Sequence, residues 1–463
     1  MQNEMTTPQR VCFVGLGKLG APIAAATAVA GVEVVAVDRD VEKVAAVNRG
    51  EAAVEEPGLE ALMERVGGAG GRLRATTEVA EAVGGGGGAE MTFLIVPTPS
   101  GEDGGFVLDA VLAAVREVGE ALRMSRRPHV VVVTSTVMPG STAGPIREAL
   151  ESASGRLVGG EDGLGLCYSP EFIALGSVIK DYLTPDLVLI GESDAAAGDA
   201  LEAFSRRVTL NAPPVRRMNL VNAELTKLTL NTFVTTKLTF ANTVAAVCEG
   251  LPGADVDVVT GAIGLDSRVG GKCLKGATGY GGPCFPRDNR ALRALGRSVG
   301  ADVRLPGAVD AVNDGVVDRL VGMVEGVSGG DAPVLVLGLS YKPGTGVVEQ
   351  SQGLMVAERL AEAGRRVVVH DPMGMDAARG VLGDAVGYEG DWRAAVEEVS
   401  GAGGTVVLAM PWEQYLEVGS VMRGGVLVDA WRGVDVSGLA EGVGYVAVGR
   451  GAVAGDSRKA EAA

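Results

Sequence analysis

The fold of this chain is decided close to its start, where residues 11–20 read VCFVGLGKLG. The apolar run Val11–Val14 is typical of a buried strand, and an Ala-rich helical pattern opens at Gly20. Between them, Gly15 permits a tight turn and Gly17 lets a pyrophosphate approach the backbone, while Gly20 lets helix and strand pack closely. This order of strand, turn and helix predicts a dinucleotide site at the helix N-terminus.

An acidic residue stands where such a site needs one. Asp38 follows the next apolar run, Val32–Val37, and lies 18 residues after Gly20. A carboxylate there accepts hydrogen bonds from a ribose 2′-hydroxyl, which favours NAD over NADP. Arg39 keeps NADP open as an alternative, and an α/β turn without a ligand is the purely structural interpretation. The residues expected to bind NAD in this part of the chain are Gly15, Gly17, Lys18, Leu19, Gly20, Asp38 and Lys43.

Apolar runs continue to alternate with helical patterns along the chain, which is the signature of β-α-β units around parallel sheets. We expect strands at 93–96, 130–134 and 187–190, and again at 334–337, 366–370, 405–409 and 426–428. Residues 222–249 between them contain no internal Gly or Pro and predict one long helix. The predicted fold is α/β, with two Rossmann-like doubly wound domains joined by a central long-helix region. The expected domains are 1–211, 212–312 and 313–463.

Composition excludes several classes of function. The 463 residues include 41 Lys and Arg against 58 Asp and Glu, a net charge of −17, so neither nucleic acid nor an anionic membrane is an expected partner. The five Cys form no C-x-x-C pair and there are only two His, which argues against a disulfide framework, a metal site and a histidine triad. No apolar run approaches 18 residues, and the predicted location is the cytoplasm.

Two further stretches contain residues suited to chemistry. Residues 279–288 read GYGGPCFPRD, so Cys284 follows a Gly-rich turn and Asp288 stands four positions later. A thiolate nucleophile needs a cationic neighbour or a helix N-terminus, whereas the structural alternative is a buried Cys in a tight turn. Lys227 and Asn231 share one face of the long helix, where a buried Lys can stabilise an oxyanion or move a proton. An exposed Lys on a solvated face is the alternative.

Polar loops follow several of the expected strands, and ligands sit at the carboxyl ends of strands in such sheets. The loops at 97–99, 134–140 and 169–172 are therefore candidate ligand loops, although each is also compatible with ordinary turn chemistry. The candidate cofactor contacts among them are Pro97, Thr98, Pro99, Ser135 and Thr136, and Glu171 is a candidate acid.

Taken together, these segments resemble the UDP-glucose/GDP-mannose dehydrogenase family from Val11 to Arg432. The stretch 266–288 is the most specific and is closer to the UDP-glucose branch than to the branches that oxidise N-acetylated hexosamines. Residues 337–345, LGLSYKPGT, match the opening of the family's C-terminal nucleotide-binding domain, and Asp371-Pro372 ends the next strand as it does there.

The resemblance implies an NAD-dependent oxidation of a C6 alcohol to a carboxylate in two hydride transfers. Cys284 would be the nucleophile that forms a thiohemiacetal and then a thioester. Lys227 and Asn231 would stabilise negative charge on O6, Asp288 would support a proton relay, Glu171 would assist thioester hydrolysis, and Thr136 would lie by the nicotinamide. The residues implied to bind the nucleotide sugar are Glu171, Phe172, Lys227, Asn231, Arg268, Lys275, Tyr280, Gly281, Tyr341, Lys342 and Arg432. A homodimer through the central helix is implied as well.

The chain departs from the family pattern at two positions. Leu175 stands where a second Glu is usual, and Glu349 replaces an Arg that approaches the cofactor in the family. Both changes bear on cofactor affinity and thioester hydrolysis. UDP-glucose is the expected substrate, with GDP-mannose or a UDP-N-acetylhexosamine as alternatives. The other interpretations are a homologue that binds a nucleotide sugar without completing its oxidation, and an epimerase that would not need Cys284.

Overall fold

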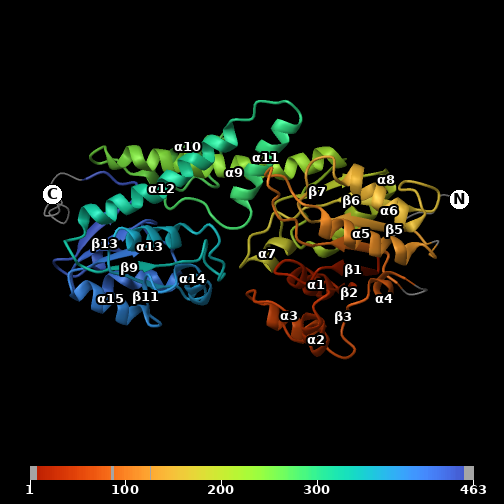
Figure 1. Ribbon diagram of the computed structural model, residues 1–463, viewed down its shortest axis with the longest axis horizontal. Coiled ribbons are helices and arrows are strands. Elements are labelled where there is room, and N and C mark those ends of the chain that lie inside the picture. The colour runs from red at the N-terminus through yellow and green to blue at the C-terminus, as the bar shows by residue number, and fades with distance from the viewer. Residues whose placement is uncertain (1–7, 85–87, 126, 453–463) are drawn as a thin grey trace. The chain divides into compact units, whose positions relative to one another are not determined.

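The computed structural model describes residues 8–84, 88–125 and 127–452. The chain divides into two compact units, one that ends at Thr229 and one that begins at Leu230. Each unit contains a β-sheet with helices packed on both of its faces (Figure 1). The predicted α/β fold with two doubly wound sheets is confirmed. The division into 1–211, 212–312 and 313–463 stays a prediction.

The N-terminal sheet has eight strands in the order β3-β2-β1-β4-β5-β6-β7-β8. All neighbouring strands are parallel except β6 and β7. The first six strands follow the order of a dinucleotide-binding fold, in which ligands bind where the order reverses, between β1 and β4. The strands are β1 (Arg10–Val14), β2 (Glu33–Val37), β3 (Leu73–Thr76), β4 (Met91–Leu94), β5 (His129–Val133), β6 (Leu164–Tyr168), β7 (Val188–Glu192) and β8 (Val215–Asn219).

Helices cover this sheet on both sides, which explains why its strands are almost wholly apolar. One apolar cluster joins the sheet to α1 (Gly20–Val29), α2 (Val41–Arg49), α3 (Leu59–Val66), α7 (Val178–Leu183) and α8 (Ala195–Val208). The other cluster joins the opposite face to α4 (Val79–Val83), α5 (Asp109–Leu122), the π-helical turn η1 (Thr142–Ile146) and α6 (Arg147–Ser154).

A long helix follows, as predicted. Helix α9 (Leu220–Glu249) runs from the first unit into the second. Most of its Thr side chains donate hydrogen bonds to carbonyls three or four residues earlier, as Thr229 does to Leu225 at 2.8 Å. The buried hydroxyls of Thr232 and Thr239 have no hydrogen-bond partner among the described residues. The central helices that come next are α10 (Val256–Gly264), α11 (Phe285–Ser298) and α12 (Leu305–Val327).

The C-terminal sheet has six parallel strands in the order β11-β10-β9-β12-β13-β14. Its strands are β9 (Val334–Leu337), β10 (Val367–His370), β11 (Gly387–Tyr388), β12 (Thr405–Leu408), β13 (Val426–Asp429) and β14 (Gly444–Ala447). One face packs against α12, α13 (Gln352–Glu362) and α14 (Met375–Leu382). The other face packs against α15 (Trp392–Gly401), the 3-10 turn η2 (Glu413–Glu417) and α16 (Val418–Val421), with the 3-10 turn η3 (Val436–Gly438) nearby in the chain (Figure 1).

Sequence patterns gave no bounds for five strands and misplaced two others. Strands β3, β8, β11 and β14 were not expected, because they are short or carry polar residues; β8 reads VRRMN and, among the described residues, pairs with β7 alone. Strand β6 was expected only as the strand end before the loop at 169–172, and its run LGLCY was not recognised. The strand expected at 93–96 spans Met91–Leu94 instead, since its register is set by pairing with β1 and β5. The run at 187–190 forms β7, which is antiparallel to β6 and not parallel as predicted.

Among the described residues, no helix combines the length and apolarity required to cross a bilayer. The cytoplasmic location stays a prediction.

Candidate active site

The glycine turn after β1 has the geometry that a dinucleotide requires. Gly15 adopts φ +106°, and a Cβ there would lie 2.1 Å from the Ile95 carbonyl oxygen. At Gly20 a Cβ would lie 1.9 Å from the Gly15 oxygen, so the first and third glycines are needed for packing. At Gly17 a Cβ would meet nothing within 4 Å. The middle glycine therefore leaves its backbone open to a ligand, while Lys18 projects to solvent beside it.

Asp38 lies at the end of β2 and borders a pocket of about 170 Å³. Its carboxylate accepts hydrogen bonds from the backbone N–H groups of Leu16 at 2.6 Å and Asp40 at 2.9 Å, and remains partly exposed. The pocket is lined by Gly15, Asp38, Arg39, Thr77, Pro97 and Glu117, among others. A carboxylate beside an apolar pocket and an open glycine turn fits the adenosine half of NAD. Lys43 lies one turn along α2, 3.9 Å from the Asp40 carboxylate.

The loops after β4 and β5 are joined by hydrogen bonds. Thr98 donates its hydroxyl to the Thr136 carbonyl at 2.8 Å, and the Ser135 hydroxyl donates to the Val96 carbonyl at 2.7 Å. The predicted cofactor residues of the two loops, Pro97, Thr98, Pro99, Ser135 and Thr136, therefore form one structural element at the carboxyl edge of the sheet.

Two buried glutamates bind the backbone of segments at or just after the candidate ligand loops, and sequence analysis missed both. Glu224 on α9 accepts hydrogen bonds from the N–H groups of Gly140 at 2.6 Å and Thr142 at 2.8 Å. Glu56 accepts in the same way from Gly176 at 2.9 Å and Val178 at 2.8 Å. A carboxylate that takes two backbone donors fixes a loop firmly. Their distance along the chain from the loops, 82 residues or more, left no local signal.

Lys227 is held by the loop that follows β6. Its ammonium donates to the Glu171 carbonyl at 2.7 Å and lies 4.8 Å from the centre of the Phe172 ring, and the Lys side chain is buried. Burial raises the pKa of the Glu171 carboxyl to about 7, against the opposing charge of Lys227. Glu171 is therefore suited to exchange a proton near neutral pH. Leu175, in the same loop, packs against the apolar cluster of the N-terminal sheet.

In the second unit, Cys284 occupies the N-cap position of α11. The amides at a helix N-terminus favour a negatively charged sulfur. One turn into the helix, the buried carboxylate of Asp288 accepts a hydrogen bond from the Asn231 side-chain amide at 2.6 Å. The predicted partners Cys284, Asp288 and Asn231 thus come from one helix N-terminus and from α9.

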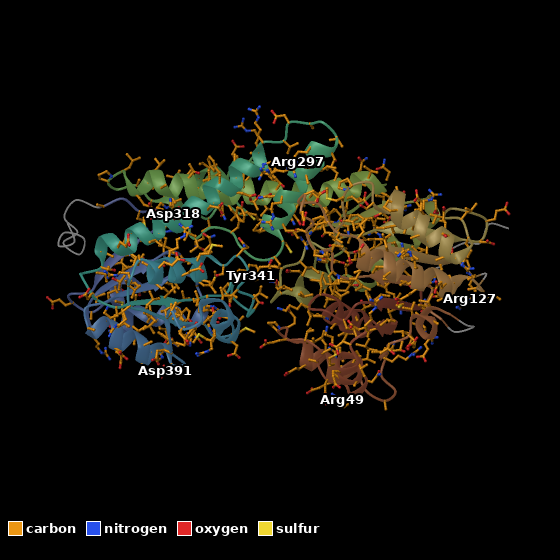
Figure 2. All side chains as sticks on the ribbon, viewed as in Figure 1. Arg49, Arg127, Arg297, Asp318, Tyr341 and Asp391 are labelled. Carbon is orange, nitrogen blue, oxygen red and sulfur yellow. The ribbon has the colours of Figure 1, made fainter. Side chains whose placement is uncertain are left out.

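The glycines before Cys284 are required by close packing. A Cβ at Gly281 would lie 2.1 Å from the Gln350 carbonyl oxygen, and a Cβ at Gly282 would lie 2.6 Å from the ring of Tyr341. Tyr341, labelled in Figure 2, lies in the loop after β9 beside Lys342. The Glu349 carbonyl accepts a hydrogen bond from the Gly282 N–H at 3.0 Å, whereas its side chain is exposed.

Tyr280 is bound into the protein itself. Its hydroxyl donates to Asp310 at 2.6 Å, and Asn313 bonds to both its N–H at 2.8 Å and its carbonyl at 3.0 Å. The side-chain amide of Asn289 donates to the same Tyr hydroxyl and to Asp310. Asp310 and Asn313 were missed because they lie 30 and 33 residues from Tyr280 in the chain, whereas Asn289, nine residues away, carried no motif of its own. They brace the turn that leads to Cys284.

The remaining predicted substrate residues differ in their surroundings. Arg432 adopts φ +55°, is fully buried in its side chain, and forms a bidentate pair with Asp257 at 2.7 and 2.9 Å. This pair lowers the pKa of Asp257 although burial opposes it. Arg268 is exposed and pairs with Asp266 at 2.7 Å, and Lys275 is exposed as well. Arg268 and Lys275 are therefore accessible to a dissolved ligand, whereas the side chain of Arg432 is not.

Comparison with known proteins agrees with this arrangement along the chain. Family models of the UDP-glucose/GDP-mannose dehydrogenase family match it in order: the NAD binding domain at residues 9–209, the central domain at 221–315 and the UDP binding domain at 335–436.

Individual relatives are similar over most of their length. A UDP-glucose 6-dehydrogenase of Haloferax volcanii is 36% identical over 91% of this chain and 96% of its own. A GDP-mannose 6-dehydrogenase of Pseudomonas putida is 36% identical over 78% of this chain and 80% of its own. The solved UDP-glucose dehydrogenase of Pyrobaculum islandicum is 35% identical, with a TM-score of 0.84, over 95% of this chain and 98% of its own.

Proposed function

The chain belongs to the UDP-glucose/GDP-mannose dehydrogenase family, whose enzymes use NAD, and we propose that it oxidises UDP-glucose to UDP-glucuronate. The observation that carries the proposal is Cys284 at the N-terminus of α11, with the Asn231–Asp288 hydrogen bond one turn deeper. A covalent oxidation to the carboxylate needs a nucleophilic sulfur, and a buried, hydrogen-bonded carboxylate near it supports the proton relay; an oxidation that stops at the aldehyde needs no such nucleophile.

NAD supplies a hydride acceptor for each of the two oxidations. Lys227 stabilises the negative charge that develops on the sugar O6, and its position over Phe172 and the Glu171 carbonyl restricts its movement. Cys284 adds to the aldehyde carbon, forms a C–S bond and passes its proton towards O6, which gives a thiohemiacetal. After the second oxidation the thioester remains on Cys284.

Water then cleaves the thioester, with Glu171 as the base. Its pKa of about 7 matches this role, because a group that titrates near the working pH can both take up and release a proton. Cys284 regains its proton as the carboxylate departs. One alcohol, one water and two NAD thereby give one carboxylate, two NADH and three protons.

Two other outcomes have support. The Pseudomonas relatives named for GDP-mannose favour the same chemistry on another nucleotide sugar. Leu175, which packs on an apolar cluster, and Glu349, whose side chain is exposed, favour a homologue that binds a nucleotide sugar without completing its oxidation.

We test the proposal by the yield of NADH per mole of UDP-glucose, run to completion. Two NADH per sugar are expected. Cys284→Ala cannot form the thiohemiacetal and should lose that yield of two, while Cys273→Ala, which removes another exposed thiol, keeps it. No NADH from UDP-glucose, with two NADH from GDP-mannose or a UDP-N-acetylhexosamine, would change the substrate. Binding of these sugars without any NADH would overturn the dehydrogenase assignment.

We further propose a homodimer through α9. Phe233, Phe240 and Val247 recur every seven residues and are 63%, 48% and 57% exposed. Large apolar side chains repeated at this spacing form one stripe on a helix, which is stabilised when a second copy covers it. Sedimentation is expected to give a dimer that Phe233→Ser/Phe240→Ser converts to monomer. Val381→Ser, at an exposed Val on α14, is the control; a monomeric parent chain would contradict the proposal.

A further inference from the structure

The pocket beside Asp38 contains a second carboxylate that no sequence motif indicated. Glu117 projects from α5 and lines the same pocket as Asp38 and Arg39. It lies 78 residues after Arg39 in the chain, and its carboxylate accepts a hydrogen bond from the Arg39 guanidinium at 2.7 Å. The residue next to the ribose-binding acid is therefore engaged by another helix.

Arg39 matters because of what a free guanidinium does at this position. In dinucleotide-binding folds, an Arg near the end of the second strand accommodates the 2′-phosphate of NADP. An Arg binds phosphate well because its planar fork presents two parallel donors. By sequence, Arg39 is the feature that leaves NADP open for this chain. In the structure, one of those donors is already used by Glu117.

The charge at the pocket also disfavours a phosphate. Two carboxylates, Asp38 and Glu117, line the pocket with one guanidinium, so its lining has a surplus of one negative charge. The nearby Lys43 ammonium lies 3.9 Å from the Asp40 carboxylate, which offsets its charge. A 2′-phosphate bound here would add negative charge to a lining that already has a surplus of it, and the two partly exposed carboxylates would repel it.

We propose that Glu117 determines the cofactor specificity of this chain, because it holds Arg39 away from a 2′-phosphate and repels that phosphate directly. The chemical class that it rejects is a 2′-phosphorylated dinucleotide, and the class that it admits carries a free 2′-hydroxyl. The inference deepens the proposed function but rests only on its cofactor site, and not on the identity of the sugar.

The Arg39–Glu117 ion pair contributes little to the stability of the fold. The Arg39 and Glu117 side chains are 75% and 44% exposed, and exposed ion pairs contribute little to stability. Removing the pair is therefore expected to leave the melting temperature unchanged while it changes which dinucleotide binds. A purely structural role for Glu117 would produce the opposite result.

The test is a fluorescence titration of the full-length protein with NADH and NADPH in the absence of sugar. Glu117→Gln is expected to tighten NADPH binding about tenfold and to change NADH binding less than twofold. Glu120→Gln is the matched control, because it removes the same charge one turn further along α5 at an exposed position outside the pocket. In the control, neither affinity should move.

A second variant tests whether Arg39 is the group released. Arg39→Gln/Glu117→Gln should lose most of the NADPH gain, since the phosphate then has no guanidinium to bind. Equal NADPH affinities in Glu117→Gln and Glu120→Gln would overturn the proposal, and so would a gain that persists without Arg39. A protein that binds NADH but oxidises no nucleotide sugar would contradict the proposed function alone and leave this result valid.

Discussion

The first strand of each sheet, β1 and β9, leads into the same glycine turn, but the loop between that turn and the next helix differs between the two sheets. Strands β1 and β9 each lead into a glycine of positive φ, Gly15 at +106° and Gly338 at +99°. In both, the glycine N–H bonds to the carbonyl at the end of the neighbouring strand, at 2.7 Å to Val37 and 2.9 Å to His370. The residue directly after each neighbouring strand is an aspartate, Asp38 after β2 and Asp371 after β10. One local solution therefore occurs twice in the chain.

The difference lies in the chain between that glycine and the following helix. Gly20 follows Gly15 by five positions, whereas Gly353 follows Gly338 by fifteen. In both sheets a glycine of the helix packs directly against the carbonyl of the turn glycine. A Cβ at Gly353 would lie 2.0 Å from the Gly338 oxygen, and a Cβ at Gly20 would lie 1.9 Å from the Gly15 oxygen. The longer C-terminal loop contains Tyr341 and Lys342.

The two aspartates consequently face different surroundings. Asp38 is partly exposed and accepts two backbone hydrogen bonds. Asp371 is buried, and its carboxylate accepts from the backbones of Leu339, Ser340, Met373 and Gly374, from the Ser340 hydroxyl and from the Trp412 indole. A carboxylate with its lone pairs occupied has no capacity left for a ribose. The same position is thus open to solvent in one sheet and filled by the fold in the other.

The largest expected effect is on the glycines that the sheets share. Gly15→Ala would place a Cβ 2.1 Å from the Ile95 oxygen, and Gly338→Ala would place one 2.3 Å from the Met410 Cβ. We expect each to lower the free energy of unfolding by about 3 kcal/mol or more. The three Trp, at 392, 412 and 431, all lie in the second unit, so Trp fluorescence in urea reports Gly338→Ala and calorimetry reports Gly15→Ala.

Gly17→Ala is the control for this pair, since its Cβ would meet nothing within 4 Å. It should leave unfolding nearly unchanged and weaken NADH binding, because the methyl group occupies space that a pyrophosphate needs. If Gly15→Ala or Gly338→Ala changed stability by less than about 1 kcal/mol, the two turns would not be equivalent.

The next effect separates the two aspartates. Asp371→Ala leaves several buried N–H groups without an acceptor and should cost about 3 kcal/mol of stability, as measured by Trp fluorescence during urea unfolding. Asp38→Ala should cost less than about 1 kcal/mol, because its site is partly exposed, but should weaken NADH binding about tenfold or more. Equal stability losses in the two variants would show that Asp38 is as tightly bound into the fold as Asp371.

The smallest effect is a titration in the N-terminal unit. The pKa of Glu171 is about 7 in the fold, above its ordinary value of 4.5, so the folded protein retains a proton that the unfolded chain releases. The contribution of Glu171 to the free energy of unfolding is therefore fully present below about pH 4.5. It decreases as the pH rises to about 7, by up to about 3 kcal/mol. Glu171→Gln should remove this slope from calorimetric scans between pH 4.5 and 7. A slope that Glu171→Gln leaves intact must come from another group.

Sequence patterns predicted the parts of the fold that are decided locally. Apolar runs marked most strands of the two sheets because both faces of such strands are covered, and the absence of internal Gly and Pro marked α9. Strand β8 was missed because its Arg residues suit an edge position that a pattern does not reveal. The reversed direction of β7 was missed because strand direction is set by pairing with β6.

Motifs likewise identified candidate residues but not the residues that position them. Cys284 and Asp38 were found because each lies in a short run of distinctive spacing. Glu56, Glu224 and Asn313 were not, because each contacts a loop at least 33 residues away in the chain. Arg432 was expected at the substrate, and the structure pairs it with Asp257, 175 residues away.

The amino-acid sequence by itself determined the strand–turn–helix units, because the glycines, the apolar runs and the acid after the second strand act on neighbours a few residues away. Only the tertiary structure decided what each unit is used for. Whether a strand-end aspartate stays open, as Asp38 does, or is filled, as Asp371 is, depends on donors brought from elsewhere in the chain. Arg39 is engaged for the same reason, since packing of α5 places Glu117 beside it.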